Sequence, residues 1–329
     1  MDYVNLGKSG LKVSRICLGC MSYGDPSKGV HSWVLNESDS LPYFKKALDS
    51  GINFFDTANM YSIGASEEVL GRAINSLTKR EEVVIATKVY FPMRQDPNST
   101  GLSRKSILFE IDQSLKRLQT DYVDLYQIHR LDTTTPMEEI LEALHDVVKS
   151  GKARYIGVSS LYAWQLAKML YLAQATNLTR YISIQPHYNL LYREEEREMF
   201  PLCKEEGIGV IPWSPLARGR LARPYGTSTN RTETDTFGKK LYAQTQESDK
   251  LIISAVERIA KKRNATMSQI SLAWMLSKPY ITAPIVGATK PHHLNDALAS
   301  LSIKLTDEEI KELEDPYTPR NVSGIEIIR

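Results

Sequence analysis

Four polar residues whose side chains could together move protons stand at or just beyond the ends of apolar runs in the sequence. The runs, at residues 52–55, 83–87 and 123–128, are typical of buried β-strands, and helical patterns separate them. If these strands are neighbours in a parallel barrel, the four side chains converge at its carboxyl end, where such barrels keep their catalytic residues. The four are an acid, a phenol, an amine and an imidazole: Asp56, Tyr61, Lys88 and His129.

The chemistry that these four groups could perform together is the delivery of a proton to oxygen. A free tyrosine has a pKa near 10 and is a slow acid at neutral pH. We therefore expect the ammonium of Lys88 to lower the pKa of Tyr61. Asp56 would hold that ammonium in place and keep it charged, and His129 would donate a hydrogen bond to the oxygen that receives the proton.

Each of the four residues also has an ordinary structural explanation when it is taken alone. An aspartate after a strand is commonly a cap or a turn former, and a single tyrosine or histidine is more often a packed side chain than a catalyst. A lysine at the end of an apolar run could instead form a Schiff base, as in barrel aldolases. The spacing between Asp56 and Tyr61 and the strand-end placement of all four favour the proton-transfer interpretation.

A series of motifs carries a family resemblance from Leu6 to about Leu313. The stretch from Gly51 to Gly71, which holds Asp56 and Tyr61, resembles the signature of the aldo-keto reductase family. The sequence is most similar to the family's fungal aryl-alcohol-dehydrogenase-like branch, which is itself similar to potassium-channel β-subunits. Further motifs follow in the family's order: Ala86-Thr-Lys88, Asp124-Leu-Tyr-Gln-Ile-His129, Gly157-Val-Ser-Ser160, Gln185-Pro-His-Tyr-Asn189 and Trp213-Ser-Pro-Leu216.

The resemblance implies an NADPH-dependent reductase of aldehydes or ketones, or an alcohol dehydrogenase, with Tyr61 as the general acid. A second interpretation, from a different class, is a redox-sensing regulatory subunit like the channel β-subunits. A third interpretation is a lyase or aldolase that forms a Schiff base through Lys88.

Strand-like and helix-like patterns alternate along the whole chain, which predicts one (β/α)8 TIM barrel domain over residues 1–329. Residues 3–13 predict a hairpin that turns at Ser9-Gly10, and in the resembled family such a hairpin plugs the barrel floor. Ser103 is expected to cap one helix and Thr135-Pro136 to begin another. The predicted strands lie near 15–19, 52–56, 83–88, 123–129, 154–159, 181–185, 208–213 and 282–286, and the helices near 40–50, 65–77, 103–118, 136–150, 162–175, 193–206, 249–276 and after 290.

Two long loops, from Phe91 to Leu102 and from Arg218 to Ser248, follow predicted strands on the carboxyl-end side. Loops of this length in a compact domain are usually functional or disordered. We expect both to cover a ligand.

The sequence has no Gly-x-Gly-x-x-Gly after its first strand, so a Rossmann dinucleotide site is not supported. By resemblance, the nicotinamide carboxamide would contact Ser159, Ser160 and Gln185, and Trp213 would stack on the ring. Trp213 could instead be packed in the core, and the arginines of the loop that follows it could instead belong to a solvated lid. The resemblance assigns the pyrophosphate to Ser214, Leu216, Arg218 and Gly219, with possible added charge from Arg220 and Arg223.

The segment from Gly287 to Ala297 matches the family's adenosine-phosphate segment in spacing. Its loop enters a predicted helix N-terminus, which suits a phosphate. Thr289, Lys290 and His293 could all meet a 2′-phosphate, so NADPH is favoured over NADH, although His293 and Asp296-Ala297 depart from the pattern of close relatives.

A cluster of aromatic and apolar residues is expected near the same end of the barrel and predicts a pocket for an apolar aldehyde. The sequence does not indicate which carbonyl compound is the substrate, or the oligomeric state. The pocket residues are Met21, Tyr23, Met60, Tyr90 and Phe91, together with His129 and Trp213.

The composition is that of an ordinary globular protein, with 329 residues, 42% hydrophobic and 24% charged. The net charge of +2 does not indicate a nucleic-acid partner, and the apolar stretches are too short to span a membrane. Three cysteines and the absence of a signal-peptide pattern favour the cytoplasm. Cys17-Leu-Gly-Cys20 lacks the second pair that a zinc site needs, so we expect two buried structural thiols and no metal.

Overall fold

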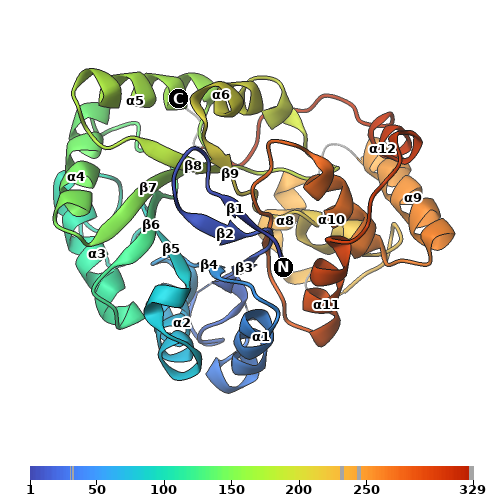
Figure 1. The fold of residues 1–329 in the computed structure, drawn as a ribbon, viewed down its shortest axis with the longest axis horizontal. Helices are drawn as coiled ribbons and strands as arrows, with labels where there is room; N and C mark the ends of the chain where they lie inside the picture. Colours follow the sequence, from blue (N-terminus) through green and yellow to red (C-terminus); the bar gives the residue numbers. More distant parts are fainter. Residues whose placement is uncertain (30, 32, 230–232, 243–245, 326–329) are drawn as a thin grey trace.

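The computed structural model describes residues 1–29, 31, 33–229, 233–242 and 246–325, and its centre is a barrel of eight parallel strands (Figure 1). The barrel closes where β9 meets the chain before β10: Val210 forms a parallel bridge with Ile281, and the Ile285 N–H donates to the Pro212 carbonyl at 2.9 Å. The predicted (β/α)8 barrel is confirmed. In their order around the barrel the strands are β10 (Ile285–Val286), β3 (Cys17–Gly19), β4 (Phe54–Asp56), β5 (Val84–Val89), β6 (Val123–Ile128), β7 (Ala153–Ser159), β8 (Tyr181–Gln185) and β9 (Gly209–Val210).

The predicted N-terminal hairpin is present as β1 (Tyr3–Asn5) and β2 (Lys12–Ser14). The predicted turn at Ser9-Gly10 lies within a connection of six residues, in which the Leu6 N–H donates to the Leu11 carbonyl at 2.8 Å. The left-handed position in this loop is Gly7, at φ 61°. A side chain there would collide with the barrel backbone, because an added Cβ would lie 2.5 Å from the Gly207 carbonyl oxygen.

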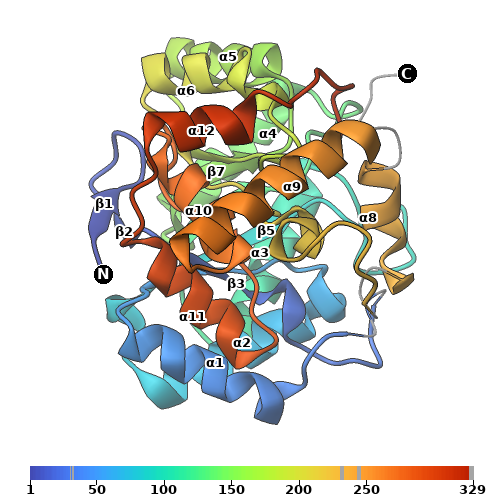
Figure 2. The ribbon, with the colours of Figure 1, turned by 90° about the vertical axis from the view of Figure 1, so that its right-hand side faces the viewer.

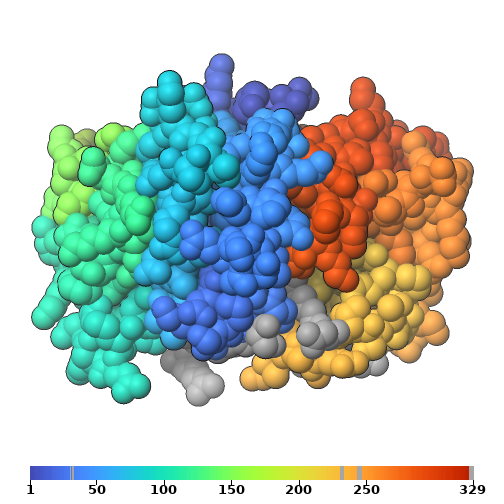
Figure 3. Space-filling model, turned by 90° about the horizontal axis from the view of Figure 1, so that it is seen from below, coloured from blue at the N-terminus to red at the C-terminus, as the bar shows by residue number. Residues whose placement is uncertain are grey.

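The hairpin closes the amino-terminal end of the barrel. Leu6 and Val13 from the hairpin pack into the same apolar cluster as Phe54, Ala86 and Leu125, which point into the barrel. The hairpin lies at the opposite end of the molecule from helix α8 (Thr236–Leu241), as Figures 2 and 3 show. The floor role implied by the family resemblance is therefore confirmed, and the other end of the barrel remains for a ligand.

Helices surround the barrel and bury its outer face in the larger apolar cluster. Ser103 caps α3 by accepting from the Ser106 N–H, as predicted, whereas the Thr135 hydroxyl donates to Asp132 instead of capping α4. The helices are α1 (Glu37–Asp49), α2 (Ala65–Leu77), α3 (Arg104–Leu118), α4 (Met137–Lys149), α5 (Ala163–Ala175), α6 (Met199–Glu206), α8, α9 (Gln246–Arg263), α10 (Met267–Ser277), α11 (Pro291–Ser300) and α12 (Asp307–Glu314).

Two predicted segments differ from the structure. The single helix expected over 249–276 is two helices, because Asn264 adopts a left-handed conformation and Thr266 caps α10. The expected loop from Arg218 to Ser248 contains the end of a 3-10 helix (Ala217–Ala222), helix α8 and the start of α9. Its residues 230–232 and 243–245 lie outside the described part. Across the described residues, no helix is long and apolar enough to cross a membrane.

Candidate active site

Three of the four predicted catalytic residues are in direct contact. Lys88 lies in β5, Asp56 ends β4, and Tyr61 begins the short 3-10 helix Tyr61–Gly64. The Lys88 Nζ donates to Asp56 Oδ1 at 2.5 Å and to the Tyr61 hydroxyl at 3.2 Å. A third bond, to the Thr57 carbonyl at 2.8 Å, fixes the ammonium. The Lys88 side chain is fully buried, so this arrangement holds the charge away from water.

Strand alternation explains why these side chains meet. Phe54 and Ala86 belong to the cluster inside the barrel, so Asp56 and Lys88, two residues further along each strand, also point inward. In the register of β5 and β6, Lys88 lies opposite Gln127. The inward positions nearest the carboxyl ends are thus polar, and the deeper ones are apolar.

Gln127 is a member of this site that the sequence interpretation missed. Asp56 Oδ2 accepts from Gln127 Nε2 at 3.1 Å and from Gln185 Nε2 at 2.8 Å. Together with Lys88, these amides give the buried carboxylate three hydrogen bonds. The signal that could have identified Gln127 is its inward position, two residues before His129.

His129 lies beside the phenol, just after β6. Its ring centroid is 5.8 Å from that of Tyr61 and 5.0 Å from that of Phe91, both edge-on. Burial, and then the charges of Lys88 and Arg130, hold the pKa of His129 well below its usual value, so the imidazole is neutral. Its Nδ1 is buried and has no hydrogen-bond partner among the described residues.

Lys88 acts on the pKa of Tyr61 in the predicted direction, but burial has the larger effect. Burial raises the pKa of Tyr61, and the nearby ammonium only partly offsets this, so the pKa lies above that of a free tyrosine. The sequence interpretation omitted this desolvation. Burial alone would lower the pKa of Lys88, but Asp56 and Tyr61 outweigh it and the pKa is raised. A Schiff-base lysine needs a lowered pKa, so the aldolase interpretation is not supported.

The turn that presents Tyr61 is strained. Ser62 and Ile63 follow it with φ values of 47° and 51°, and Gly64 has φ 89°. A β-branched residue such as Ile63 is a genuine outlier in this left-handed region. Its side chain is 55% exposed, so packing does not explain the conformation. Strain of this kind concentrates at functional sites, and the sequence interpretation did not identify it.

The residues assigned to the carboxamide form one connected group at the ends of β7 and β8. The Ser159 hydroxyl donates to the Gln185 carbonyl at 2.8 Å, and the Trp213 indole N–H donates to the Ser160 hydroxyl at 3.0 Å. The Gln185 amide nitrogen is already bonded to Asp56. The structure thus links the predicted nicotinamide contacts to the Lys88–Asp56 pair.

The segment 214–219 has an unusual backbone. Ser214, Ala217 and Arg218 are left-handed residues other than glycine, with φ values of 55°, 48° and 56°. The Ala217 and Gly219 N–H groups donate to the Ser214 and Leu216 carbonyls, at 2.9 and 2.8 Å, so the segment folds back on itself. The Arg218 guanidinium is paired with Asp235, and its Nη2 is buried with no partner in the described part of the chain. The remaining predicted contacts, Leu216 and Gly219, are partly exposed in the same segment.

The segment assigned to the adenosine phosphate also comes together. The Thr289 N–H donates to His293 Nδ1 at 3.3 Å, and Lys290 is exposed immediately before α11. Gly287, also exposed, opens the segment. Asp296 lies on the buried side, where it accepts from Gln269 Nε2 at 2.9 Å. An exposed cation therefore stands immediately before a helix N-terminus, an arrangement that suits a phosphate.

Most of the predicted substrate-pocket residues are partly exposed, but Tyr23 is not. Tyr90 and Phe91 contact each other edge to face at 5.1 Å, and Phe91 contacts His129. Tyr23 is fully buried, and its hydroxyl donates to the Ala288 carbonyl at 2.8 Å. Its ring packs in the outer core, so the pocket assignment of Tyr23 is corrected. Met21 and Met60 keep partial exposure.

The Cys17–Cys20 motif does not form a redox pair or a metal site in the described chain. Cys17 belongs to the cluster inside the barrel and Cys20 to the cluster outside it, as expected from strand alternation. Both thiols are free and buried, and burial raises their pKa well above the ordinary value.

Comparison with known proteins identifies the family. The model of the aldo/keto reductase family matches residues 15–317. The chain is 47% identical over 342 residues to versiconal hemiacetal acetate reductase of Aspergillus parasiticus, with 98% of each chain covered. It is 44% identical over 337 residues to a Saccharomyces cerevisiae protein named after aryl-alcohol dehydrogenase, with 96% of this chain and 97% of that protein covered. The chain therefore belongs to the aldo-keto reductase family, and its relatives include fungal aryl-alcohol-dehydrogenase-like proteins.

Family membership supports an oxidoreductase that acts on the carbonyl groups of small molecules and uses a nicotinamide cofactor. The regulatory-subunit interpretation is not favoured, because the relatives are named as reductases and dehydrogenases.

Proposed function

We propose that the protein is an NADPH-dependent reductase of aldehydes and ketones, with Tyr61 as the general acid. The observation that carries this proposal is the contact of Lys88 Nζ with both Asp56 and the Tyr61 hydroxyl, next to a buried His129 nitrogen with no described partner. Such a cluster can deliver a proton to an oxygen and stabilise the charge that remains.

The four residues divide the chemistry. A bound nicotinamide supplies the hydride to the carbonyl carbon. Tyr61, whose raised pKa keeps it protonated at neutral pH, gives its proton to the carbonyl oxygen. Lys88 stabilises the phenolate that is left, and Asp56 keeps Lys88 charged and fixed. His129, as a neutral imidazole, donates a hydrogen bond to the same oxygen.

We assign the rest of the cofactor to the residues around the site. Ser159, Ser160 and Gln185 would hold the carboxamide, and Trp213 would stack on the ring. Residues 214–219 would follow the pyrophosphate. Lys290, with Thr289 and His293, would meet a 2′-phosphate, which favours NADPH over NADH.

The proposed substrates are aromatic or otherwise apolar carbonyl compounds. Phe91 packs against His129, and Tyr90 packs against Phe91, so the wall next to the catalytic oxygen position is aromatic. Met21 and Met60 would extend this apolar surface. The three buried free thiols accord with a reducing compartment such as the cytoplasm.

Cofactor oxidation tests the proposal directly. Purified protein should oxidise NADPH when an aromatic aldehyde such as 4-nitrobenzaldehyde is added. No turnover with any member of a panel of aldehydes, ketones and quinones, while NADPH is seen to bind, would reject a reductase.

The cofactor preference has its own test in Lys290→Ala. One charge-assisted hydrogen bond contributes roughly 1.5–3 kcal/mol, so the KM for NADPH should rise about 10- to 150-fold while that for NADH stays nearly constant. Lys304→Ala, which removes a lysine outside the segment, serves as the control. Equal losses with both cofactors would show that Lys290 does not read the 2′-phosphate.

A further inference from the structure

His187 occupies a position behind the cofactor groove that the proposed mechanism leaves unused. It follows β8 and is 2% exposed. Its ring stacks on Trp213 with a centroid distance of 4.3 Å and an interplanar angle of 11°, and on Tyr192 at 4.3 Å and 14°. A parallel bridge between His187 and Trp213 places the two rings side by side. The three rings form a continuous stack, so one face of Trp213 is set by His187.

The edge of the imidazole is attached to helix α8. His187 Nε2 lies 2.9 Å from the hydroxyl of Tyr242, the C-cap residue that follows α8 and is 1% exposed. Asn189 Nδ2 donates to the same hydroxyl at 3.0 Å. Burial, and then the charges of three arginines, lower the pKa of His187 to about 3, so the ring is neutral. The Tyr242 hydroxyl, which accepts from Asn189, can therefore donate its own proton to Nε2.

Asn189 carries the connection to the predicted phosphate-binding segment. Its Nδ2 also donates to the Ser214 carbonyl at 3.0 Å, at the first left-handed residue of segment 214–219. Its Oδ1 accepts from the Leu191 N–H at 2.9 Å, which fixes the orientation of the amide. One short loop after β8 thus holds the Trp213 ring, the Ser214 backbone and the end of α8.

We propose that His187, Asn189 and Tyr242 form a positioning network that sets the affinity for the nicotinamide cofactor through Trp213 and Ser214. The inference rests on the proposed function, because it takes Trp213 as the surface on which the nicotinamide stacks. None of the three residues acts on the substrate. They fix the orientation of the groups that contact the cofactor, and helix α8 supplies the third anchor.

Tyr242→Phe tests the network with the smallest change, because it removes the hydroxyl and keeps the ring. The loss of one or two hydrogen bonds should raise the dissociation constant for NADPH about 3- to 30-fold, measured by the change in cofactor fluorescence. Tyr171→Phe is the matched control, since it removes an exposed hydroxyl bonded to Glu206. A purely structural role for Tyr242 would lower the melting temperature and leave the dissociation constant unchanged.

A double-mutant cycle identifies the route of the effect. In a Trp213→Leu background, the effect of Tyr242→Phe on the NADPH dissociation constant should be smaller than in wild type, because the part transmitted through His187 to the Trp213 ring is lost and only the part through Asn189 and Ser214 remains. Full additivity of the two substitutions would overturn the route through Trp213.

Hydrogen exchange of the cofactor-free protein separates this inference from the proposed function. Amides of 236–242 should exchange faster in Tyr242→Phe than in wild type, whether or not NADPH binds. Unchanged exchange would reject the network even if the enzyme proves to be a reductase. A failure of wild-type protein to bind NADPH would reject the proposed function, and also the role of the network in cofactor affinity, but not the attachment of α8.

Discussion

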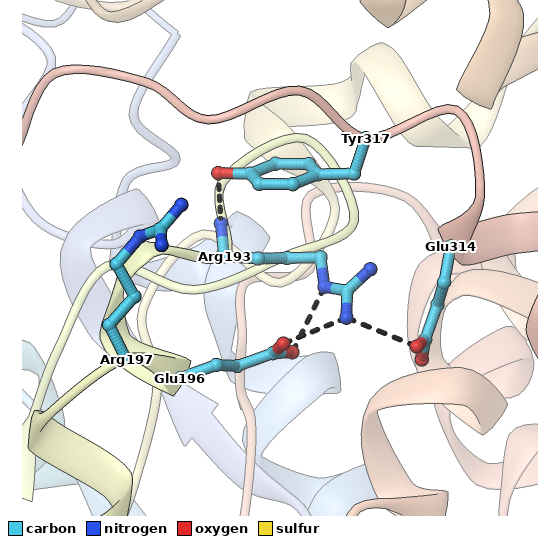
Figure 4. A pocket seen from close by; sticks show the side chains of 5 residues that line it. All are labelled: Arg193, Glu196, Arg197, Glu314 and Tyr317. Atoms are coloured by element: carbon cyan, nitrogen blue, oxygen red, sulfur yellow. Dashed lines mark hydrogen bonds and ion pairs between the residues drawn. The ribbon is translucent and has the colours of Figure 1, made fainter.

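Two clusters in this protein combine a cation, carboxylates and a tyrosine, and one of them is a structural link at the surface. In a surface cavity of about 270 Å³, the Arg193 guanidinium donates to Glu196 at 2.7 Å and to Glu314 at 3.1 Å (Figure 4). The Tyr317 hydroxyl accepts from the Arg193 backbone N–H at 2.9 Å and donates to Glu194 at 2.7 Å. The permanently charged guanidinium, and the phenol that both donates and accepts, thus join the chain after β8 to the end of α12.

The cluster at the strand ends is built from similar groups but keeps some of them unsatisfied. The Tyr61 hydroxyl accepts from Lys88, and its own proton has no acceptor among the described residues. The His129 Nδ1 is likewise without a described partner. A buried polar group left unpaired lowers the stability of the fold. The unpaired groups of Tyr61 and His129 therefore lower stability in a way that the cluster around Arg193 does not. Residue types alone therefore do not mark a candidate active site, and the unpaired Tyr61 proton and His129 Nδ1 distinguish this cluster from the one around Arg193.

The largest expected effect is on catalysis, and it distinguishes removal of the Tyr61 hydroxyl from removal of the Tyr317 hydroxyl. Tyr61→Phe should lower kcat/KM for an aromatic aldehyde by about 10²- to 10⁴-fold, because it removes the general acid. Tyr317→Phe should leave kcat/KM within a factor of about 2 and lower the free energy of unfolding instead. Steady-state kinetics and urea denaturation of both variants provide the measurement. Near-wild-type turnover in Tyr61→Phe would remove Tyr61 from the mechanism.

A second prediction concerns the charge beside the phenol. Lys88→Met removes the ammonium and hydrogen bond that lower the pKa of Tyr61, so that pKa rises further above 10. Because a general acid loses activity as the pH rises through its pKa, the alkaline limb of the pH–rate profile should move to higher pH. The rate on the plateau should fall, because the phenolate is no longer stabilised.

The double variant Lys88→Met with Asp56→Asn controls for misfolding. Lys88→Met alone leaves a buried carboxylate without its cation, which costs about 3–5 kcal/mol. Removing both charges should recover most of that stability and none of the activity. An unchanged alkaline limb in a folded Lys88→Met protein would contradict the electrostatic role.

The barrel and the meeting of the four polar residues were predictable from the sequence, because both depend on short-range periodicity. Alternation in β4, β5 and β6 places Asp56, Lys88 and Gln127 inside the barrel, and parallel strands bring their ends together. Desolvation was not predictable, because it depends on how deeply the finished fold buries Tyr61. The net direction of its pKa shift therefore became clear only from the structure.

Contacts between distant segments account for the other differences. Tyr23 follows β3 after the 3-10 helix Cys20–Ser22, but its ring packs against Phe44 at 5.0 Å in the outer core. The stack of His187 on Trp213 joins residues 26 positions apart, and no local pattern predicts it. At Asn264 the local sequence did carry a signal, because this asparagine adopts a left-handed conformation and breaks the long helix that was predicted.

A third prediction tests the structural character of the cavity cluster. Arg193→Met should lower the free energy of unfolding by about 1.5–3 kcal/mol at neutral pH, as expected for hydrogen bonds to charged groups. Burial alone would raise the pKa of Glu314, but its bonds to Lys278 and Trp274 and the charge of Arg193 outweigh this, and the pKa is lowered.

The loss of stability in Arg193→Met should depend on pH, because the pKa of Glu314 is lowered in the folded protein. A carboxyl whose folded-state pKa is lowered adds stability above its unfolded pKa and loses it as the pH falls. The difference between wild type and Arg193→Met should therefore narrow on acidification. Urea denaturation at neutral pH and near pH 4 measures it, and a constant difference would assign the loss to packing of the arginine stem.

The smallest expected effect is that of a substitution at Ile63, in the strained turn that follows Tyr61. Ile63 adopts φ 51° with a side chain that is 55% exposed, and a left-handed conformation costs a residue with a Cβ about 1–2 kcal/mol. Asparagine tolerates this conformation better, so Ile63→Asn should raise the free energy of unfolding by about 0.5–1 kcal/mol. Because the backbone of the turn is retained, Tyr61 should keep its position and kcat/KM should change by less than about 3-fold. Thermal unfolding and aldehyde reduction measured on the same preparation decide between two outcomes. A gain in stability with activity retained would assign the strain to the Ile63 backbone alone, and a loss of activity would show that the exposed Ile63 side chain is itself part of the substrate site.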